Sequence, residues 1–449
     1  MDLKQMYASA EQQYRQRTVK SEQEYKLAQQ YFPGGVTRNT NYYAPYPITV
    51  VHSEGAKLHD ADGNQYYDYI YNYGSIIHGH AHPEIARRVR EALSSGTAVA
   101  ASIPEQMELA RIIRERVPSI EQLRYCNSGL EATLFAIKTA RAYKGRPAII
   151  KMEGGFHGYH DLVEHSVKPP IATKMQDPFW KPIPNSMGIS QSIADEVYIA
   201  PFNNAEAVEA ILKEKASEIA AIIVEPVLGA SGTVPAMPGY LAELRLLADQ
   251  YDVLLIFDEV LTLRIDYGGA QGYYDVVPDL TTTAKIIGGG FPVAAFGGRA
   301  DIMSILDPGR SDYVIHSGTF SGNNVSMVAG ITSMQLYDRE AVARMRTLTD
   351  RTINGINQAI QRYAIPASIS AVNSMMTLHF TEQPPVNYET GVLTSRKDLL
   401  KFLHLELMNN GIFISPRGAL YLSTALTEAD IDHTVAVIDS ALDKIAKVV

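Results

Sequence analysis

The sequence predicts an α/β fold in which helices cover a mostly parallel β-sheet. From about residue 85, short apolar runs alternate with segments of helical periodicity, which is the order of elements in such a fold. The most apolar runs, 220–224 and 253–257, do not alternate with polar residues, as expected for strands that are buried on both faces. The chain has 449 residues, more than a single core usually holds, so we expect two domains.

The segments that precede the sheet have distinct compositions. Residues 1–30 are polar and amphipathic and predict a helix, whereas 32–47 is rich in Gly, Pro, Asn and Tyr and predicts irregular structure. Residues 55–70 predict a hairpin that turns at Asp62-Gly63. Helical periodicity follows in 82–96 and 104–117.

Short apolar runs separated by helical segments are the expected strands of the sheet. They are 123–126, 148–152, 196–200, 220–225, 253–259 and 280–285. After about residue 330 the chain is again rich in helix, and it closes with a helix, two short strands and a final helix that has Glu428 and Asp430 in its first turn. The expected organisation is an N-terminal segment of a helix and a small sheet, 1–75, that belongs to the small domain, a large domain, 76–328, and a C-terminal small domain, 329–449.

Composition argues against several classes of partner. The chain has 49 acidic and 40 basic residues, and its net charge of −9 disfavours nucleic acid or an anionic membrane surface. Cys126 is the only cysteine, so the chain can form neither an internal disulfide nor a cysteine-based metal site. The first residues lack the apolar core of a signal peptide, and no apolar run approaches a membrane span. We therefore expect a cytoplasmic protein.

Residues suited to chemistry follow several of the predicted strands. Asn127-Ser128-Gly129, Glu225, Asp258-Glu259 and Lys285 each stand at a carboxyl end. Ligands of parallel sheets bind at this edge, so these side chains are expected to converge. Lys285 is the only charged residue of 281–298, and a buried ammonium is costly unless it is paired, neutralised or used chemically.

Each of these residues also has an ordinary structural interpretation. Ser128 precedes a predicted helix that ends at Gly145, so it can be an N-cap as well as part of an anion site. Asp258 can belong to a structural ion pair. A metal shared by Asp258 and Glu259 is disfavoured, because adjacent residues of a strand face opposite ways.

Two loops and two arginines complete the candidates. In 153–161, Phe156 could stack on a planar ring, while a zinc site at His157 and His160 lacks an evident third ligand. The loop 316–324 is a Ser/Gly turn that could supply a phosphate donor. Thr319 is the candidate phosphate donor of this loop. Arg38 and Arg417 could each bind a carboxylate or simply be solvated at the surface.

A partly buried lysine, an aspartate, an anion site and a stacking aromatic together meet the needs of pyridoxal phosphate (PLP). The lysine forms a Schiff base with the aldehyde, and the carboxylate keeps the pyridine nitrogen protonated so that the ring acts as an electron sink. Desolvation of Lys285 would help to keep its amine available as a nucleophile and a proton carrier.

The sequence also resembles a known family, the class III aminotransferases, PLP enzymes of fold type I. The resemblance runs from about residue 25 to the C-terminus and rests on six motifs in the family's order: NSGLEA, GGFHGYHD, VEPV, IFDEVLTLR, AKIIGGGFPVAAFGGR and HSGTFSGNN. It implies a large domain with a mostly parallel seven-stranded sheet and a smaller α+β domain built from the two ends of the chain. It also implies a homodimer with active sites at the subunit interface.

The resemblance implies roles for single residues. Lys285 would be the Schiff-base lysine, Asp258 would pair with the pyridine nitrogen, and Val260 and Phe156 would lie on opposite faces of the ring. The other cofactor-binding positions would be Ser128, Gly129, Leu130, His157 and Glu225, with Thr319 reaching the phosphate from the other subunit. Leu130 replaces the family's usual threonine and Phe156 its commoner tyrosine, so a phosphate contact and a hydroxyl are expected to be missing.

Within the family, the sequence looks most similar to the β-amino acid aminotransferases of the β-phenylalanine type and to glutamate-1-semialdehyde aminomutase. In the first branch, arginines at the positions of Arg38 and Arg417 bind the carboxylates of the β-amino acid and of the keto acid. The expected reaction is transfer of an amino group from a β-amino acid to 2-oxoglutarate or pyruvate. The alternatives are an aminomutase or PLP racemase that needs no acceptor, and a binding protein that has lost catalysis.

Overall fold

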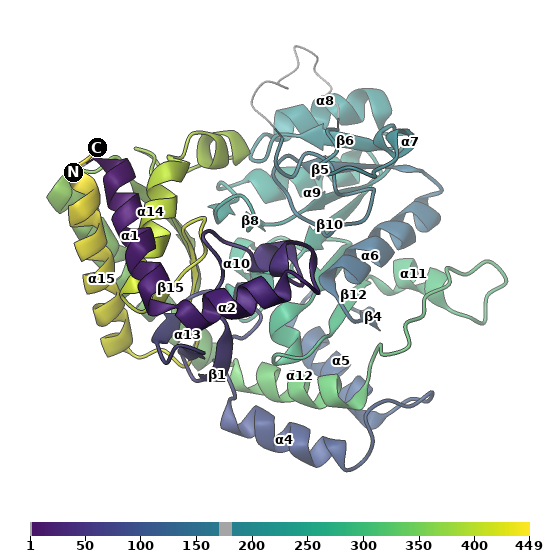
Figure 1. Cartoon of the computed structure of the whole chain (residues 1–449). Coiled ribbons are helices and arrows are strands. Elements are labelled where there is room, and N and C mark those ends of the chain that lie inside the picture. The colour runs from purple at the N-terminus through teal and green to yellow at the C-terminus, as the bar shows by residue number, and fades with distance from the viewer. Residues whose placement is uncertain (1, 170–181) are drawn as a thin grey trace. The chain divides into compact units, whose positions relative to one another are not determined.

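The large sheet is built from seven strands. The computed structural model describes residues 2–169 and 182–449, so 170–181 of the predicted large domain lie outside it (Figure 1). The strand order is β4-β12-β11-β10-β7-β5-β6. Their bounds are Gln122–Cys126 (β4), Ala294–Gly298 (β12), Leu280–Thr283 (β11), Leu254–Asp258 (β10), Ile219–Val224 (β7), Ala148–Met152 (β5) and Val197–Ala200 (β6). All neighbouring pairs are parallel except the two pairs that β12 makes, which confirms the predicted α/β fold with a mostly parallel sheet.

Alternate residues of the central strands enter two separate cores. Ile150, Ile222 and Leu255 pack in the core that includes residues of α8 (Ala205–Lys215) and α9 (Tyr240–Gln250). Ile149 and Ile256 pack in a second core, which includes residues of α6 (Gly129–Lys144). The sheet is therefore the middle layer of three, with helices on both faces (Figure 1).

β12 is the strand of this sheet that the sequence analysis did not predict, because its residues are small and glycine-rich. A Cβ at Gly297 would lie 2.5 Å from the backbone oxygen of Gln122, and one at Gly298 would lie 2.2 Å from that of Asp279. These glycines allow the neighbouring backbone to come close, so β12 is recognisable only once its neighbours are known.

By its internal contacts the chain forms a small unit and a large unit. The small unit is Met1–His82, Arg344–Pro384 and Ser395–Val449, and the large unit is Pro83–Ala343 and Pro385–Thr394. The first two changes between units fall at 82/83 and 343/344, whereas the expected boundaries are 75/76 and 328/329. Residues 385–394 return to the large unit, and the expected organisation has no such return.

The remaining elements of the large unit are mostly helices. They are α4 (Pro83–Leu93), α5 (Pro104–Arg116), α7 (Gln191–Ala194), α10 (Gly269–Tyr274), α11 (Ala300–Met303) and α12 (Asn324–Leu336), the 3₁₀ turns η4 (Thr262–Arg264), η5 (Lys285–Gly288) and η6 (Ser304–Leu306), the π-helical η7 (Glu389–Leu393), and the ribbon of β8 (Val227–Leu228) and β9 (Val234–Pro235). Helix α6 ends at Gly145, which has φ +63°, as its sequence predicts.

The small unit contains two small sheets. One has the order β1-β2-β3-β15, and β2 and β3 form the predicted hairpin; the other, β13-β14-β16, includes two strands that the sequence analysis did not predict. The strands are β1 (Val50–Glu54), β2 (Lys57–Asp60), β3 (Gln65–Asp68), β13 (Ser368–Val372), β14 (Met375–His379), β15 (Ile412–Phe413) and β16 (Ala419–Tyr421). The helices are α1 (Leu3–Arg17), α2 (Val19–Ala28), α3 (Tyr71–Gly74), α14 (Lys397–Asn409) and α15 (Glu428–Ala446), with η1 (Pro33–Gly35) and η2 (Asn39–Asn41), while α13 (Arg339–Tyr363) begins in the large unit.

Within the described ranges, 2–169 and 182–449, no helix combines the length and the apolar character that crossing a membrane requires.

Candidate functional site

Lys285 lies just beyond the carboxyl end of β11 and begins η5. Its backbone has φ +54°, a left-handed conformation that costs a residue other than glycine roughly 1–3 kcal/mol and that is concentrated at functional sites. Its side chain is partly buried. Burial lowers the pKa of the Lys285 ammonium, and the nearby carboxylates of Glu225 and Asp258 act against this shift.

Asp258 is the last residue of β10 and is held by three donors. Its Oδ1 accepts hydrogen bonds from the Thr282 hydroxyl (3.0 Å) and from the backbone N–H of Val260 (3.1 Å). Its Oδ2 lies 2.8 Å from Nδ1 of His157. The carboxylate is buried but fixed in direction, and Oδ2 keeps a lone pair for one more donor.

His157 is buried beside this carboxylate. Burial lowers the pKa of its imidazole, and Asp258 opposes the shift. A neutral ring that donates from Nδ1 to Asp258 has an unprotonated Nε2, and this atom has no hydrogen-bond partner among the residues that the structure describes. His157 therefore orients Asp258 without supplying a positive charge.

Glu225 directly follows β7 and is also buried. Its Oε1 accepts from the backbone N–H of Phe156 (2.7 Å), and its Oε2 accepts from that of Gly229 (3.2 Å). Burial, reinforced by the charge of Asp258, raises the pKa of the Glu225 carboxyl. The group thus ties the loop that carries Phe156 to the edge of the sheet.

The N-terminus of α6 provides an anion site. The side chain of Ser128 caps the helix by accepting from the backbone N–H of Glu131 (3.2 Å), while Oε2 of Glu131 accepts from the N–H groups of Asn127 and Ser128. The N–H groups of Gly129 and Leu130 make no hydrogen bond within the described part of the chain. Ser128 is therefore an N-cap, and the next two N–H groups remain available to an anion.

Small residues bring these elements close together. A Cβ at Gly129 would lie 3.0 Å from both methyl groups of Val260, so α6 starts directly against the residue that follows Asp258-Glu259. A Cβ at Gly158 would lie 3.0 Å from Leu130. Phe156 makes an edge contact with Tyr159, with ring centroids 5.0 Å apart.

Glu259 faces away from this cluster. Its carboxylate accepts from the backbone N–H groups of Ala270 (2.5 Å) and Gln271 (3.3 Å), and burial raises the pKa of the carboxyl to about 7. His160 Nε2 lies 3.5 Å from the hydroxyl of Thr133. Among the described residues, no three His, Cys, Asp or Glu side chains are placed to hold a metal ion.

The structure thus brings Ser128, Gly129, Leu130, Phe156, His157, Glu225, Asp258, Val260 and Lys285 to one edge of the sheet of the large unit. Thr319 is exposed in the loop before α12. Ser321 of this loop accepts a hydrogen bond from Nδ2 of Asn127 (3.3 Å), so the loop lies next to the start of α6.

The two arginines belong to the small unit. The guanidinium of Arg38 donates from Nε to Oδ1 of Asn41 (2.8 Å) and from Nη2 to Oδ1 of Asn72, and it lies over the ring of Tyr73, 6.0 Å from the centroid. Arg417 is exposed in the turn between β15 and β16.

Thr282 is a site residue that the sequence analysis missed. It lies opposite Asp258 in the parallel pairing of β10 with β11. The sequence showed three consecutive threonines, 281–283, but only knowledge of which strands are neighbours could assign one of them to Asp258.

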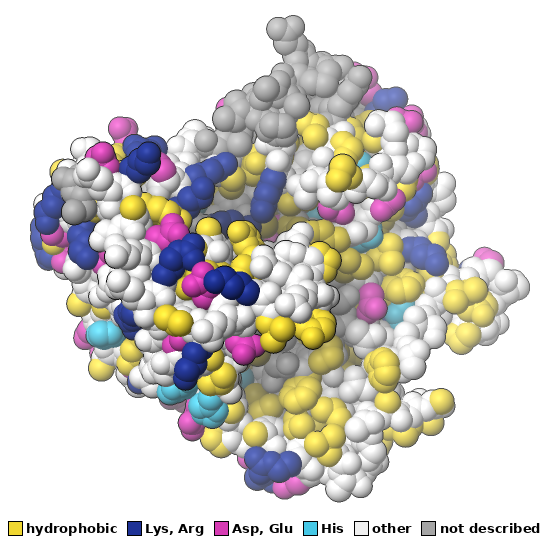
Figure 2. All heavy atoms as spheres, in the orientation of Figure 1, with side chains coloured by type: hydrophobic (Ala, Val, Ile, Leu, Met, Phe, Trp, Pro, Cys, Tyr) yellow, Lys and Arg dark blue, Asp and Glu magenta, His cyan; other side chains and the backbone are white. Residues whose placement is uncertain are grey.

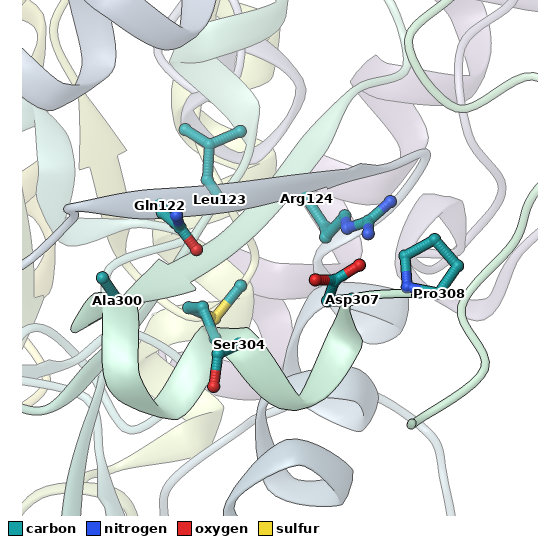
Figure 3. Close-up of a pocket in the computed structure, with 8 residues that line it drawn as sticks. Gln122, Leu123, Arg124, Ala300, Ser304, Asp307 and Pro308 are labelled. Atoms are coloured by element: carbon teal, nitrogen blue, oxygen red, sulfur yellow. The ribbon is translucent and has the colours of Figure 1, made fainter. Parts of the chain in front are cut away.

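A separate cavity of about 260 Å³ lies between β4 and α11 (Figure 3). Figure 3 shows Gln122, Leu123 and Arg124 on the strand, with Asp307 and Pro308 across the hollow. Arg124 donates to the backbone oxygen of Leu306 (2.9 Å). The lining includes none of the residues grouped around Lys285.

Comparisons with known proteins agree with this geometry. Residues 39–449 match the model of the aminotransferase class-III family. A curated protein from Geobacillus thermodenitrificans named glutamate-1-semialdehyde 2,1-aminomutase 2 is 40% identical over 423 residues, which are 93% of this chain and 96% of that protein.

Solved structures of transaminases are also similar. An omega-transaminase from Sphaerobacter thermophilus has a TM-score of 0.92 and 38% identity, covering 95% of this chain and 98% of that one. A β-phenylalanine aminotransferase from Variovorax paradoxus has a TM-score of 0.89 and 35% identity, covering 98% and 97%.

The match spans both units, and the motifs that it includes are those gathered at the edge of the sheet. The chain belongs to the class III aminotransferase family: it is a fold type I enzyme, and its cofactor is pyridoxal phosphate.

Proposed function

We propose that the enzyme transfers an amino group from a β-amino acid, of the β-phenylalanine type, to a keto acid such as 2-oxoglutarate or pyruvate. The observation that carries the proposal is the fixed orientation of Arg38, which Asn41, Asn72 and Tyr73 hold in place. An oriented guanidinium binds a carboxylate through two parallel hydrogen bonds. The likeness to a β-phenylalanine aminotransferase supports the same substrate class.

The residues around Lys285 fit the cofactor. The free lone pair of Asp258 Oδ2 suits a pyridinium N–H, and the open N–H groups of Gly129 and Leu130 suit a phosphate. Phe156 and Val260 would lie on the two faces of the ring, and Ser128, His157, Glu225 and Thr319 would complete the binding site. The bound cofactor supplies an aldehyde for Schiff-base chemistry and an electron sink.

The protein groups carry out the proton transfers. With its lowered pKa, Lys285 has a larger fraction of free amine at neutral pH, so Nζ can attack a carbonyl and can accept a proton from a substrate carbon. Asp258, held by His157 and Thr282, would keep the pyridine nitrogen protonated. In the second half-reaction, Arg417 would bind the α-carboxylate of the keto acid, so one site would accept two substrates in turn.

The test is a panel of (R)- and (S)-β-amino acids and α-amino acids, each with 2-oxoglutarate or pyruvate. We expect turnover of β-amino acids only when an acceptor is present, and loss of the visible absorbance of the purified enzyme when a β-amino acid is added alone. Arg38→Met should raise KM for the β-amino acid much more than KM for the acceptor. If α-amino acids are turned over and β-amino acids are not, the proposed donor class is wrong.

An aminomutase is the second candidate, because the curated relatives at 36–40% identity carry that name. Such an enzyme rearranges one substrate and needs no keto acid. Conversion of glutamate-1-semialdehyde without an acceptor, at a rate above that of any β-amino acid with one, would favour this candidate over the transaminase. A racemase would instead interconvert the enantiomers of one amino acid.

We also infer that the chain acts as a homodimer. Val99, Phe291 and Phe320 are exposed on segments joined by hydrogen bonds, from Asn324 to Thr97 (3.1 Å) and from Ser326 to Pro292 (2.9 Å). Figure 2 shows hydrophobic side chains gathered on one face of the large unit, around α4 and α12. Monomeric proteins rarely leave such a patch uncovered. Light scattering should give twice the chain mass, and Phe320→Asp should lower it.

A further inference from the structure

The large unit contains a second buried lysine that the reaction described above does not use. Lys151 lies in β5 between Ile150 and Met152, and its side chain has no exposed surface. Consecutive side chains of a strand point to opposite faces, so Lys151 lies on the face opposite Ile150. This is the face of Ile149, which packs against α6. An aliphatic side chain would be the ordinary choice at such a position.

The ammonium of Lys151 bridges two distant points of one loop. Nζ donates to the backbone oxygen of His165 (2.6 Å) and to that of Gly155 (3.1 Å). The loop between these residues is already closed by the backbone bond from Gly154 to Ser166 (2.8 Å). The two hydrogen bonds of Lys151 join the same two parts of the loop a second time, and they give both buried carbonyls a donor.

The loop held in this way carries the two residues that face the cofactor site. Phe156 follows Gly155 directly, and its N–H is bound by Glu225; His157 comes next and is bound to Asp258. A shift of Gly155 would move both side chains, because they belong to consecutive residues. Burial lowers the pKa of Lys151 to about 7, and the charges of Glu225 and Glu153 act against this shift.

We propose that Lys151 is a positioning residue for the cofactor site: by joining the carbonyls of Gly155 and His165, it fixes the loop that places Phe156 and His157. The proposal rests on the proposed role of these two residues in holding PLP. Lys151 itself needs to touch neither cofactor nor substrate, since its effect passes through the loop backbone.

The experiment compares Lys151→Met, which keeps the length of the side chain without donors, with Lys151→Gln, whose amide can donate to both carbonyls. The matched control is Ile150→Ala, the preceding residue of the same strand, which faces the opposite core. Each variant is freed of PLP, checked for folding by circular dichroism, and titrated with PLP while the visible absorbance is followed. Thermal midpoints are recorded in parallel.

We expect Lys151→Met to weaken PLP binding at least tenfold and Lys151→Gln to recover a large part of this loss. Ile150→Ala should lower the thermal midpoint while leaving the dissociation constant within about twofold. In the loaded enzymes, Lys151→Met should lower kcat more than it raises KM for the amino donor, because the misplaced groups contact the cofactor.

Equal PLP affinity of Lys151→Met and the wild type would overturn the proposal. It would also be overturned if Ile150→Ala lost PLP affinity in proportion to its loss of stability, because destabilisation of the strand would then account for the effect. If Lys151→Met does not fold, Lys151→Gln decides alone: a PLP dissociation constant within threefold of the wild type supports a donor role, and a larger loss of affinity contradicts it. Failure of the wild type to bind PLP would instead overturn the cofactor site itself.

Discussion

Asp258 and Glu259 are consecutive residues whose carboxylates have opposite surroundings. Asp258 is bound by His157 and Thr282 at the edge of the sheet, while Glu259 accepts from the backbone of α10. Asp258→Asn keeps an oxygen that accepts from Thr282, turns an NH₂ group toward the neutral ring of His157, and removes the charge that protonates the pyridine nitrogen. We expect kcat to fall by at least about 100-fold, with little loss of folding stability.

Glu259→Gln is the matched control for this prediction, because it makes the same chemical change one residue away on the other face. Its kcat should stay within about threefold of the wild type. Steady-state kinetics and PLP titration of both variants measure the effect. A comparable loss of kcat in the two variants would show that burial of the carboxylate, and not its place beside the cofactor, decides the outcome.

The raised pKa of Glu259 predicts how stability depends on pH. The ordinary pKa of the carboxyl is 4.5, and in the folded protein it is about 7. The folded state therefore binds the proton more tightly, so the contribution of Glu259 is complete below pH 4.5 and is lost as pH rises through 7. The shift corresponds to a loss on the order of 3 kcal/mol. Urea unfolding between pH 5 and 8 should show a smaller decline for Glu259→Gln than for the wild type.

At the scale of single residues, the sequence was most informative where strands end. Lys285, Asp258 and Glu225 could be chosen because the carboxyl ends of parallel strands meet. Thr282 could not, because its role depends on which strand lies beside β10. Lys151 was hidden by an ordinary strand pattern, and its partners lie up to 14 residues away in a loop with no regular structure.

The start of α6 is the element on which phosphate binding depends. Gly129→Ala would place a Cβ 3.0 Å from the methyl groups of Val260, forcing the helix start or Val260 to move. We expect PLP affinity to fall about tenfold, which corresponds to about 1.4 kcal/mol. Absorbance titration of the apoenzyme measures this.

The opposite end of the same helix supplies the control. Gly145 has φ +63°, and a Cβ added there would meet no atom within 4 Å, so Gly145→Ala should cost about 1 kcal/mol of folding stability through its backbone alone. Its affinity for PLP should equal that of the wild type. Similar PLP constants for the two variants would contradict a specific role for the helix start.

Elements were predictable where burial followed a regular pattern. The strands of the parallel core are continuous apolar runs, and α6 has both a cap and a stop signal. β12 was not predicted because its residues are small and glycine-rich, and Gly297 and Gly298 fit a strand only once Gln122 and Asp279 are known to lie against them. In the small unit, β13 and β14 were missed within a segment interpreted as helical.

At the scale of the whole molecule, the proposed dimer makes Thr319 testable by mixing subunits. If Thr319 serves the partner's site, a Lys285→Ala chain and a Thr319→Ala chain would together form one site with both native residues. The mixed dimer should then show about half of wild-type activity, although Lys285→Ala homodimers are inactive and Thr319→Ala homodimers are weakened. Mixed activity no higher than the mean of the two homodimers would place Thr319 in the site of its own chain.

The left-handed backbone of Lys285 has a consequence for the evolution of this enzyme. Glycine adopts φ +54° without penalty, whereas lysine and alanine do not. In the absence of cofactor, Lys285→Gly should therefore unfold at a higher denaturant concentration than Lys285→Ala, by about 0.5–1 kcal/mol. Selection for thermal stability alone would therefore favour replacing Lys285 by glycine. The lysine is kept at the cost of some folding stability, because the reaction needs its amine.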